Sequence, residues 1–377
     1  MTISTTRRLV GLSAAAGLIL ALAGCGAAPT SNPTGSGSKA AAGFKPCIVS
    51  DSGGFNDHSF NEAALTGMQQ AAKDLGGIAF RQVTSKSASD YTPNMQALVA
   101  GGCTYIVSVG FNLSAATIAS AKANPKIDYA IVDDPADANN DGKTDAPNIK
   151  PLLFDTAQAA YLGGYAAAAW SDAHGTDKVG TFGGMQIPPV TIYMDGFVDG
   201  VNKFNADKGK KVQTFGWNVA TQKGSFTGAF QANDTAKQTA QGILNQGTDV
   251  ILPVGGPIYL SAAAAIRDSS KGTVMLGVDS DFVLADPSVK DIVLVSIMKR
   301  IDVAVHDAVM AGASGKFDPT TYIGTLKNGG VGLSPFHDFT SKLPAGLTDE
   351  LKSLQQKIID GSIVVQSKAT PKAASSN

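Results

Sequence analysis

Strand-like and helix-like segments alternate along most of this 377-residue chain, and this alternation constrains the fold more than any other feature. Short runs rich in Val, Ile and Tyr are followed by longer segments in which apolar residues recur every three or four positions. The first series has strand-like segments at 48–50, 78–83, 105–109 and 129–132, with helix-like segments at 60–75, 93–100 and 115–123. Such a βαβ succession predicts an α/β fold built on a parallel sheet.

A second series of the same kind follows residues 152–154. Its strand-like segments are 178–182, 212–217, 250–254, 273–278 and 292–297, and its helix-like segments are 156–170, 191–204, 234–245 and 259–267. Two such series, in a chain longer than one hydrophobic core usually supports, predict two doubly wound lobes. A helix at 301–310, a strand at 322–326 and a helix at 348–359 complete the pattern.

The chain is expected to cross between the lobes more than once, so the lobes need not be contiguous. We expect the first lobe to comprise residues 44–152 with about 297–325, and the second to comprise 153–296 with about 326–365. A disordered tail is expected at 366–377, where apolar periodicity is lost.

The N-terminus has the features of an export signal. Arg7 and Arg8 precede an apolar run at 9–23 that is too short to span a bilayer comfortably. Leu-Ala-Gly at 22–24 before Cys25 resembles the lipobox of bacterial lipoproteins, although an ordinary signal with an incidental cysteine is the alternative. We therefore expect removal of residues 1–24, lipidation of Cys25, a flexible tether at 25–43, and a protein anchored to the cell membrane outside the cytoplasm.

The remaining two cysteines form a candidate disulfide. Cys47 and Cys103 stand at the start of two predicted strands in a chain expected to be exported to an oxidising compartment. If the strand order is 2-1-3, these strands are neighbours and the two sulfur atoms can meet. The alternative is a pair of buried thiols.

Charge argues against a nucleic-acid partner. The chain has 30 basic and 31 acidic residues, a formal net charge of −1, and therefore no basic surplus for a phosphate backbone. Its four histidines are scattered and match no zinc-binding spacing. No phosphate-binding loop or nucleophile motif of a hydrolase is present in the sequence.

The densest cluster of polar residues follows the first predicted strand, at 51–62. Ligands of open α/β sheets bind at the carboxyl ends of the strands, so this cluster is a candidate binding site. Ser59 and Glu62 also fit a capping box at the start of the next helix, which by itself would explain these two residues. A capping box does not explain the other polar side chains of the cluster, Asp51, Asn56, Asp57 and Asn61.

The pattern D-x-G-x-x-N-D-x-S-F-N at 51–61 resembles the basic membrane protein family, whose members are lipoprotein substrate-binding subunits of ABC importers similar to purine nucleoside receptors. Segments at 160–167, 179–185, 196–201, 246–251, 277–281 and 296–299 agree with the family in the same order. The resemblance implies a type I periplasmic-binding-protein fold, in which two doubly wound parallel-sheet lobes joined by a hinge hold a nucleoside between them.

The resemblance also implies which residues bind the sugar of the nucleoside. An aspartate and a lysine hold the ribose hydroxyls in this family, and the matching positions are Asp279 and Lys299. A carboxylate can accept from two vicinal hydroxyls while an ammonium donates to their oxygens. The alternative is an ion pair at the hinge. Gly255 would let the backbone approach the sugar, although a plain turn at 255–256 is equally consistent.

For the base, the resemblance implies a stack between two aromatic rings. Phe60 matches the first ring, unless it is only a core residue of its helix, and Phe230 or alternatively Phe226 supplies the second. The polar contacts expected at the edge of the base are Asp57, Asn61 and Asp133, with Asp134 as the alternative to Asp133.

An acidic loop lies outside the family pattern. Asp137, Asn139, Asp141 and Asp145 stand at positions 1, 3, 5 and 9 of a calcium-loop pattern, but Asn148 occupies the twelfth position, where an EF-hand has Glu. The loop is either a structural calcium site or an Asx-rich turn.

We therefore predict a lipid-anchored receptor, not an enzyme, that binds a nucleoside, with a purine base favoured, and delivers it to a membrane permease. We expect a monomer that needs no cofactor apart from the possible calcium ion. The main alternative is the same class of receptor with a free sugar or another small polar metabolite as ligand. A nucleoside hydrolase is a remote alternative.

Overall fold

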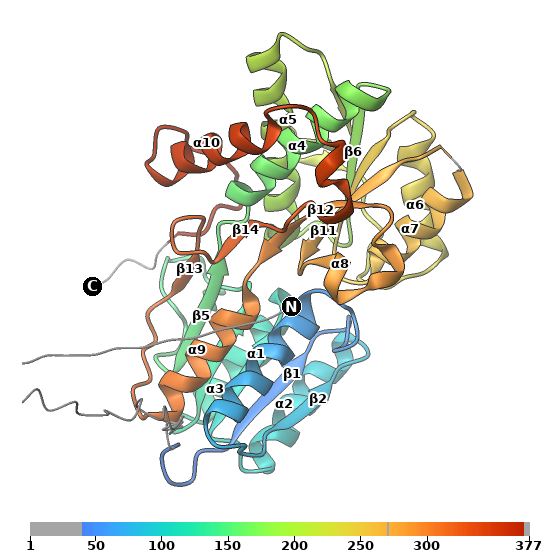
Figure 1. Cartoon of the computed structure of the whole chain (residues 1–377). Coiled ribbons are helices and arrows are strands. Elements are labelled where there is room, and N and C mark those ends of the chain that lie inside the picture. The colour runs from blue at the N-terminus through green and yellow to red at the C-terminus, as the bar shows by residue number, and fades with distance from the viewer. Residues whose placement is uncertain (1–39, 270, 373–377) are drawn as a thin grey trace, which may run out of the picture. The chain divides into compact units, whose positions relative to one another are not determined.

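The computed structural model describes residues 40–269 and 271–372 (Figure 1), so Cys25 and the expected signal lie outside the described residues. The first of its two large sheets has six strands, and every neighbouring pair is parallel. In spatial order the strands are β13 (Tyr322–Gly324), β5 (Ile149–Phe154), β4 (Asp128–Val132), β3 (Tyr105–Val109), β1 (Pro46–Ser50) and β2 (Arg81–Thr84). The order β2-β1-β3 confirms the order considered from the sequence.

Helices cover both faces of this first sheet, which explains why its strands are apolar at successive positions. The helices are α1 (Phe60–Asp74), α2 (Tyr91–Ala100), α3 (Ser114–Ala123) and α9 (Ile301–Ala313). Side chains alternate along β1, so Ile48 belongs to the core shared with α1 and α9, whereas Cys47 and Val49 belong to the core under α2 and α3. The first lobe is therefore doubly wound, as the sequence predicts.

The second sheet also has six strands. In spatial order they are β14 (Val331–Leu333), β12 (Val293–Lys299), β11 (Val274–Asp279), β10 (Val250–Val254), β6 (Lys178–Gly183) and β7 (Gln213–Phe215). All neighbouring pairs are parallel except β12 and β14, which are antiparallel. Its helices are α4 (Ala157–His174), α5 (Pro188–Lys208), α6 (Asp234–Leu244), α7 (Ile258–Ser269), α8 (Phe282–Ala285) and α10 (Leu347–Ile359).

Two parts of this second lobe differ from the sequence prediction. The single strand expected at 212–217 is divided into β7 and a short hairpin strand β8 (Trp217–Asn218), which pairs with β9 (Lys223–Gly224). Gly216 separates them with φ +87°, in close approach to the Thr181 carbonyl where a Cβ atom would collide. Strand β14 was not predicted, because three residues including a glycine carry too little periodicity.

Helices α4 and α5 pack backbone to backbone, which accounts for the small residues along both. A Cβ atom on Gly164 would collide with the Phe197 carbonyl, and one on Gly200 would collide with the Tyr161 carbonyl. This close packing fixes α5, whose first turns carry pocket residues.

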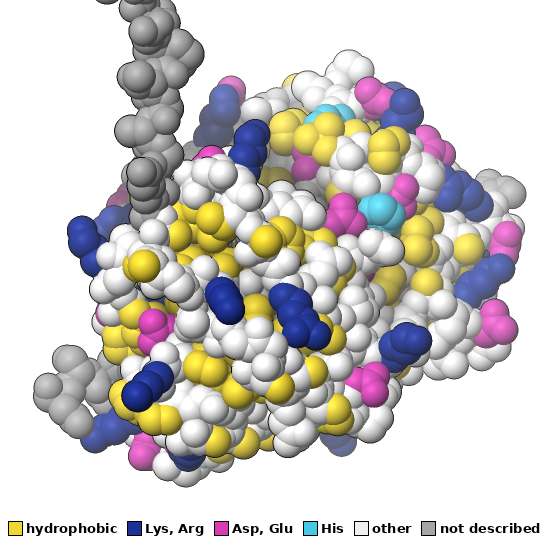
Figure 2. Space-filling model, turned by 90° about the horizontal axis from the view of Figure 1, so that it is seen from below, with side chains coloured by type: hydrophobic (Ala, Val, Ile, Leu, Met, Phe, Trp, Pro, Cys, Tyr) yellow, Lys and Arg dark blue, Asp and Glu magenta, His cyan; other side chains and the backbone are white. Residues whose placement is uncertain are grey.

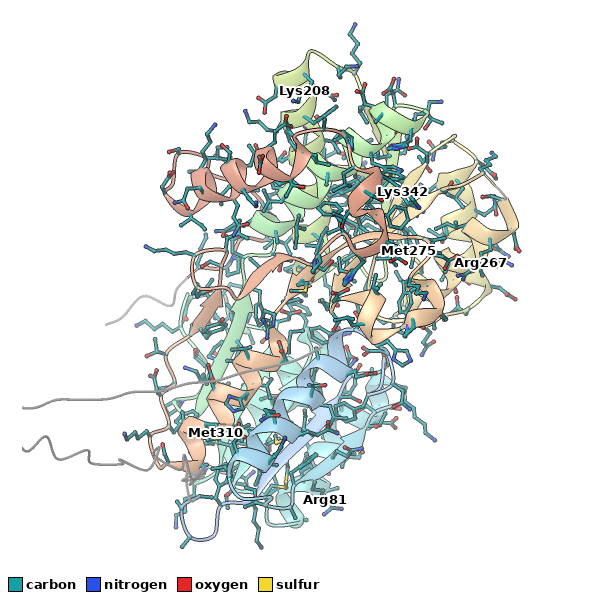
Figure 3. The ribbon with its side chains drawn as sticks, in the orientation of Figure 1. Arg81, Lys208, Arg267, Met275, Met310 and Lys342 are labelled. Atoms are coloured by element: carbon teal, nitrogen blue, oxygen red, sulfur yellow. A yellow bond between two sulfur atoms is a disulfide. The ribbon has the colours of Figure 1, made fainter. Side chains whose placement is uncertain are left out.

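The chain passes between the two sheets at three places in its described part (Figure 1). Strand β5 of the first sheet leads into α4, β12 of the second sheet leads into α9, and β13 of the first sheet leads into β14 of the second. Figure 3 labels Met275 on β11, the strand paired with β12 in the second sheet, and Met310 on α9, the helix that follows the second crossing.

The C-terminal segment is a correction to the sequence prediction. Residues 366–372, expected to be disordered, make defined contacts with the second lobe. The Ser367 hydroxyl donates to the buried Asp195 carboxylate at 2.6 Å, and Val365 is buried. The hydrogen bond from Ser367 to the buried Asp195 carboxylate holds this segment against the second lobe. Such a contact depends on the fold and leaves no apolar periodicity in the sequence.

The surface agrees with the near-neutral composition. On the face shown in Figure 2, Lys and Arg side chains are dispersed among Asp and Glu. Within residues 40–269 and 271–372, no helix combines the length and the apolar character needed to cross a bilayer.

Candidate ligand-binding site

All eight residues expected to bind the ligand line one pocket at the carboxyl ends of the strands of both sheets. They are Asp57, Phe60, Asn61, Asp133, Phe230, Gly255, Asp279 and Lys299. Asp133 follows β4, Gly255 follows β10, and Asp279 and Lys299 are the last residues of β11 and β12. The doubly wound topology therefore gathers residues that are up to 242 positions apart in the sequence, from Asp57 to Lys299.

Lys299 is the charged centre of the pocket. Its ammonium lies 2.6 Å from Asp133 Oδ2 in the first lobe and 3.4 Å from Asp279 Oδ1 in the second. All three side chains are buried. Burial alone disfavours the ammonium, but the two carboxylates outweigh it and raise the pKa of Lys299 above its usual value. The lysine is therefore a fixed positive charge that joins the lobes.

The Asp279 carboxylate accepts from three side-chain donors. Its Oδ1 accepts from the Tyr193 hydroxyl at 2.9 Å as well as from Lys299, and its Oδ2 accepts from the Ser59 hydroxyl at 2.9 Å. Asp279 has φ +65° and Asp133 has φ +67°, a left-handed conformation that aspartate tolerates better than most residues. The strand ends thus turn both carboxylates toward Lys299.

The start of α1 departs from the sequence prediction, because the Ser59–Glu62 capping box is absent. The Ser59 side chain makes no bond to its own helix. Asp57 replaces it: Oδ1 accepts from the N–H groups of Ser59 and Glu62 at 3.0 Å, and Oδ2 accepts from Asn61 N–H at 2.9 Å. A carboxylate is favoured at a helix N-terminus, because it accepts several orphan donors at once.

Asn61 ties this cap to a second buried carboxylate. Its amide donates to Asp51 Oδ1 at 2.9 Å and to Asp57 Oδ2 at 3.1 Å. Burial, together with the charges of Asp57 and Asp133, raises the pKa of Asp51 to about 6, although Gly53 N–H and the Asn61 amide act in the opposite direction. The Asn61 carbonyl oxygen is buried and has no partner among the described residues, so it can accept from a ligand.

Two phenylalanines give the pocket its apolar walls. Phe60 comes from the first lobe, and Lys299 Nζ lies 4.9 Å from the centre of its ring. Phe230 comes from the second lobe and lies close to Gly184 and Gly255, where added Cβ atoms would collide with its ring. Phe226 is not among the pocket-lining residues and packs against the Trp217 ring. Of the two alternatives from the sequence, the structure places Phe230 in the pocket.

Asp134 and the acidic loop at 137–145 form hydrogen bonds with nearby residues and not with the pocket. Asp134 Oδ1 accepts from the Ser114 hydroxyl at 2.6 Å and from Ala136 N–H at 2.7 Å, so Asp133 is the residue of this pair that faces Lys299. In the loop, Asp137 accepts from the N–H groups of Asp141 and Gly142. These are the bonds of an Asx-rich turn. Within the described residues, no group of three or more His, Cys, Asp or Glu side chains is placed to hold a metal ion.

Cys47 and Cys103 form a disulfide with their Cα atoms 6.0 Å apart. Cys47 lies on β1, and Cys103 lies two residues before the neighbouring strand β3. In Figure 3 the bond is at the end of the first lobe marked by Arg81, the residue paired with Cys47 on β2. The disulfide is therefore remote from the pocket, at the amino ends of the strands.

The sequence prediction missed several pocket residues. Tyr193 and Val190 on α5 and Asn112 after β3 line the pocket, but each stands in a segment with no unusual polar pattern. Asp51 was noted only as part of the cluster. The one available signal was position, since Asn112 follows a strand at the edge where ligands bind.

Comparison with known proteins assigns the family. The model of the Bmp family, described as ABC transporter substrate-binding protein PnrA-like, matches residues 44–369. The chain belongs to the Bmp family. It is thus a substrate-binding component of an ABC transporter and not an enzyme, which confirms both the resemblance and the function class predicted from the sequence.

Individual relatives and a solved structure agree with this family assignment and with the fold. The ABC transporter nucleoside-binding protein BmpA of Lactococcus lactis is 32% identical, over 96% of this chain and 99% of that protein. A lipoprotein of Pyrococcus horikoshii is 29% identical, over 77% of this chain and 68% of that protein. An ABC transporter solute-binding protein from Aeropyrum pernix superposes with a TM-score of 0.70 at 27% identity, covering 86% of this chain and 94% of that one. The two-lobe type I binding-protein fold is thereby confirmed.

Proposed function

We propose that this Bmp-family protein is a lipid-anchored receptor that binds a nucleoside, with a purine base favoured, and delivers it to the permease of its transporter. One observation carries the proposal. A single pocket combines an aromatic side chain from each lobe, Phe60 and Phe230, with the buried pair Asp279–Lys299. An aromatic base and a vicinal diol are the two chemical groups that such a pocket satisfies together. The nucleoside-binding relative from Lactococcus supports this choice.

The charged part of the pocket suits the ribose. The Asp279 carboxylate is a hydrogen-bond acceptor only, so it can accept hydrogen bonds from the 2′ and 3′ hydroxyls, while Lys299 donates to their oxygens. Lys299 is already neutralised by Asp133 and Asp279. The site therefore favours an uncharged sugar over a phosphate, whose negative charge would face two buried carboxylates.

The other part of the pocket suits the base. Stacking between Phe60 and Phe230 tolerates any base, because every base has a π-face. The unpartnered carbonyl oxygen of Asn61 and the carboxylate of Asp133 offer acceptors to base N–H groups. The Asp57 carboxylate already accepts from the start of α1 and from the Asn61 amide, so it holds Asn61 in place at the edge of the base. Gly255, with φ +145°, makes room for the ring of Phe230 and so shapes the stack.

Anchoring and delivery complete the proposal. Lipid on Cys25, followed by a tether rich in Gly and Ser, would keep the two-lobed domain near the permease on the outer side of the membrane. A ligand that touches both lobes shifts the protein toward the closed form by its differential affinity for that form. The permease can thereby distinguish a loaded receptor from an empty one.

A ligand panel tests the proposal. We expect inosine, guanosine and adenosine to raise the thermal unfolding midpoint, because a ligand that binds only the native state stabilises it. Free ribose and free bases should raise it far less, since each satisfies only part of the pocket. A shift with ribose that equals the shift with nucleosides would favour the sugar-binding alternative, and release of free base from inosine would favour a hydrolase.

A pair of variants tests the aromatic wall. Phe230→Ala should weaken nucleoside binding by about 1 to 3 kcal/mol, roughly 5- to 150-fold in Kd, through loss of one stacking surface. Phe226→Ala, which alters a neighbouring ring outside the pocket, is the matched control and should bind with an almost unchanged Kd. Isothermal titration measures both. Equal losses in the two variants would contradict the assignment of Phe230.

A further inference from the structure

The hydroxyl of Ser59 bonds to the opposite lobe. Ser59 directly precedes α1 in the first lobe, and its Oγ lies 2.9 Å from Asp279 Oδ2 and 3.2 Å from the Val278 carbonyl, both at the end of β11 in the second lobe. The residue is fully buried. Because Asp57 has taken over the cap of α1, the Ser59 hydroxyl is free for this bond.

The backbone of Ser59 is held from both lobes as well. Its N–H donates to Asp57 within the first lobe, and its carbonyl accepts from Ala63 in α1 and from the Ser280 hydroxyl of the second lobe at 3.3 Å. Ser59 thus donates to Asp279 and accepts from Ser280, so two hydrogen bonds of opposite direction cross between the lobes at this residue.

These hydrogen bonds couple the contact between the lobes to the orientation of the Asp279 carboxylate. Tyr193, in the same lobe as Asp279, fixes Oδ1 of the carboxylate whatever the position of the other lobe. Ser59 fixes Oδ2 only while α1 lies against the end of β11, so separation of these two elements breaks the bond. A hydrogen bond to a buried carboxylate is among the stronger ones in proteins, and its loss leaves a buried acceptor short of a donor.

We propose that Ser59 is a positioning residue that latches the two lobes together and, by the same bond, orients Asp279 for the ligand. The inference rests on the proposed function for the identity of the ligand, but the latch itself forms between protein groups. The proposal predicts that Ser59 mainly slows dissociation of the ligand, because its bond to Asp279 forms as the lobes close around the ligand.

The test uses variants that separate latching from orientation. Ser59→Ala removes the hydrogen bond from Ser59 to Asp279 and leaves the Lys299–Asp133 contact between the lobes in place. Tyr193→Phe removes the donor to the other oxygen of the same carboxylate from within one lobe. Ser280→Ala removes only the longer hydrogen bond, from the Ser280 hydroxyl to the Ser59 carbonyl, and provides a second variant if Ser59→Ala does not fold. Ser59→Thr retains the hydroxyl and should restore the behaviour of the unmodified protein.

Distances between the lobes are measured by electron paramagnetic resonance, with spin labels on cysteines replacing Gln69 on α1 and Gln238 on α6, both exposed. A Cys25→Ser background leaves these two cysteines free, since Cys47 and Cys103 are paired. Stopped-flow measurements with inosine give the association and dissociation rates.

We expect Ser59→Ala to shift the distances toward separated lobes and to raise the dissociation rate about tenfold or more, with the association rate nearly unchanged. Ser280→Ala should act in the same direction but less strongly. Tyr193→Phe should weaken binding while its saturated complex keeps the distances of the unmodified protein.

Unchanged distances and an unchanged dissociation rate in Ser59→Ala would overturn the latch, as would equal distance shifts in Ser59→Ala and Tyr193→Phe. Failure of the proposed function has a different signature. If the unmodified protein shows no response to any nucleoside but Ser59→Ala still shifts the distances of the ligand-free protein, the latch stands and the nucleoside assignment is wrong.

Discussion

At the scale of single residues, the pocket is an arrangement of buried carboxylates in a small space. Asp51 and Asp57 are buried, as is the side chain of Asp133, and burial raises the pKa of each carboxyl. Lys299, backbone N–H groups and the Asn61 amide each stabilise part of this negative charge, but burial outweighs them. These buried carboxylates therefore make the stability of the folded protein depend on pH.

Asp51 makes this pH dependence testable. Its pKa rises from 3.8 in the unfolded chain to about 6 in the folded protein, so the folded state binds more protons in this window and the free energy of unfolding falls as pH rises through it. Asp51→Asn keeps an oxygen acceptor for Gly53 and Asn61 but carries no charge. Between pH 4 and pH 7 the variant should gain about 2 to 3 kcal/mol relative to the unmodified protein.

Urea unfolding at the two pH values measures this difference. Asp318→Asn, which changes an exposed carboxylate in the first lobe whose pKa is lowered mainly by bonds to Thr320, is the control and should not reproduce the gain. A constant difference between Asp51→Asn and the unmodified protein over the whole range would show that Asp51 does not titrate there.

At the scale of elements, the first lobe is held by the pairing of β1 with β2 and β3. The Cys47–Cys103 disulfide joins β1 to the turn before β3 on the face covered by α2 and α3. It closes a loop with a sequence separation of 56, which contains β2, α1 and α2. The same strand β1 ends at Ser50, directly before the pocket residue Asp51, so the position of β1 affects the site.

Removal of this disulfide should destabilise the protein. The double variant Cys47→Ala, Cys103→Ala is expected to lose about 2 to 4 kcal/mol of unfolding free energy, because its unfolded chain regains the entropy of an open loop. Denaturant unfolding measures the loss. Addition of a reductant is the control: it should lower the midpoint of the unmodified protein and leave the double variant unaffected. Equal midpoints for the two proteins without reductant would contradict the prediction.

At the scale of the whole molecule, the proposed transport function involves both lobes and an anchor to the membrane. The chain passes between the two sheets at three places within its described residues, so the lobes are joined by several segments close to the pocket residues Asp279 and Lys299. Cys25 lies outside the described residues, about 20 positions before β1. The two-lobed domain and the proposed anchor are therefore separate parts of the sequence.

The anchor gives a prediction at this scale. Cys25→Ser should abolish lipid attachment and move the protein from the membrane fraction to the soluble fraction outside the cytoplasm, because no other acyl chain would hold it. Fractionation with immunodetection measures the distribution, and mass spectrometry of the mature N-terminus shows whether lipid is present. Nucleoside affinity should be unchanged, since the pocket begins at Asp51. Retention of Cys25→Ser in the membrane fraction would contradict the lipidation proposal.

The sequence by itself determined the alternation of strands and helices, the doubly wound lobes and the family. These follow from local signals, because periodicity and turn residues act within a few positions. The eight residues expected to bind the ligand were named from a resemblance, and they line one pocket because parallel strands present their carboxyl ends at one edge. The short strand β14 and the ordered segment 366–372 were missed, since each depends on partners distant in the chain.

Only the tertiary structure decided which side chains meet. It placed Phe230 in the pocket and Phe226 against Trp217, and it turned Asp133 toward Lys299. It also transferred the cap of α1 from Ser59 to Asp57, which freed the Ser59 hydroxyl for Asp279, 220 positions away. The physical reason is that a hydroxyl bonds to the strongest acceptor within reach, and the fold alone determines which acceptors are within reach.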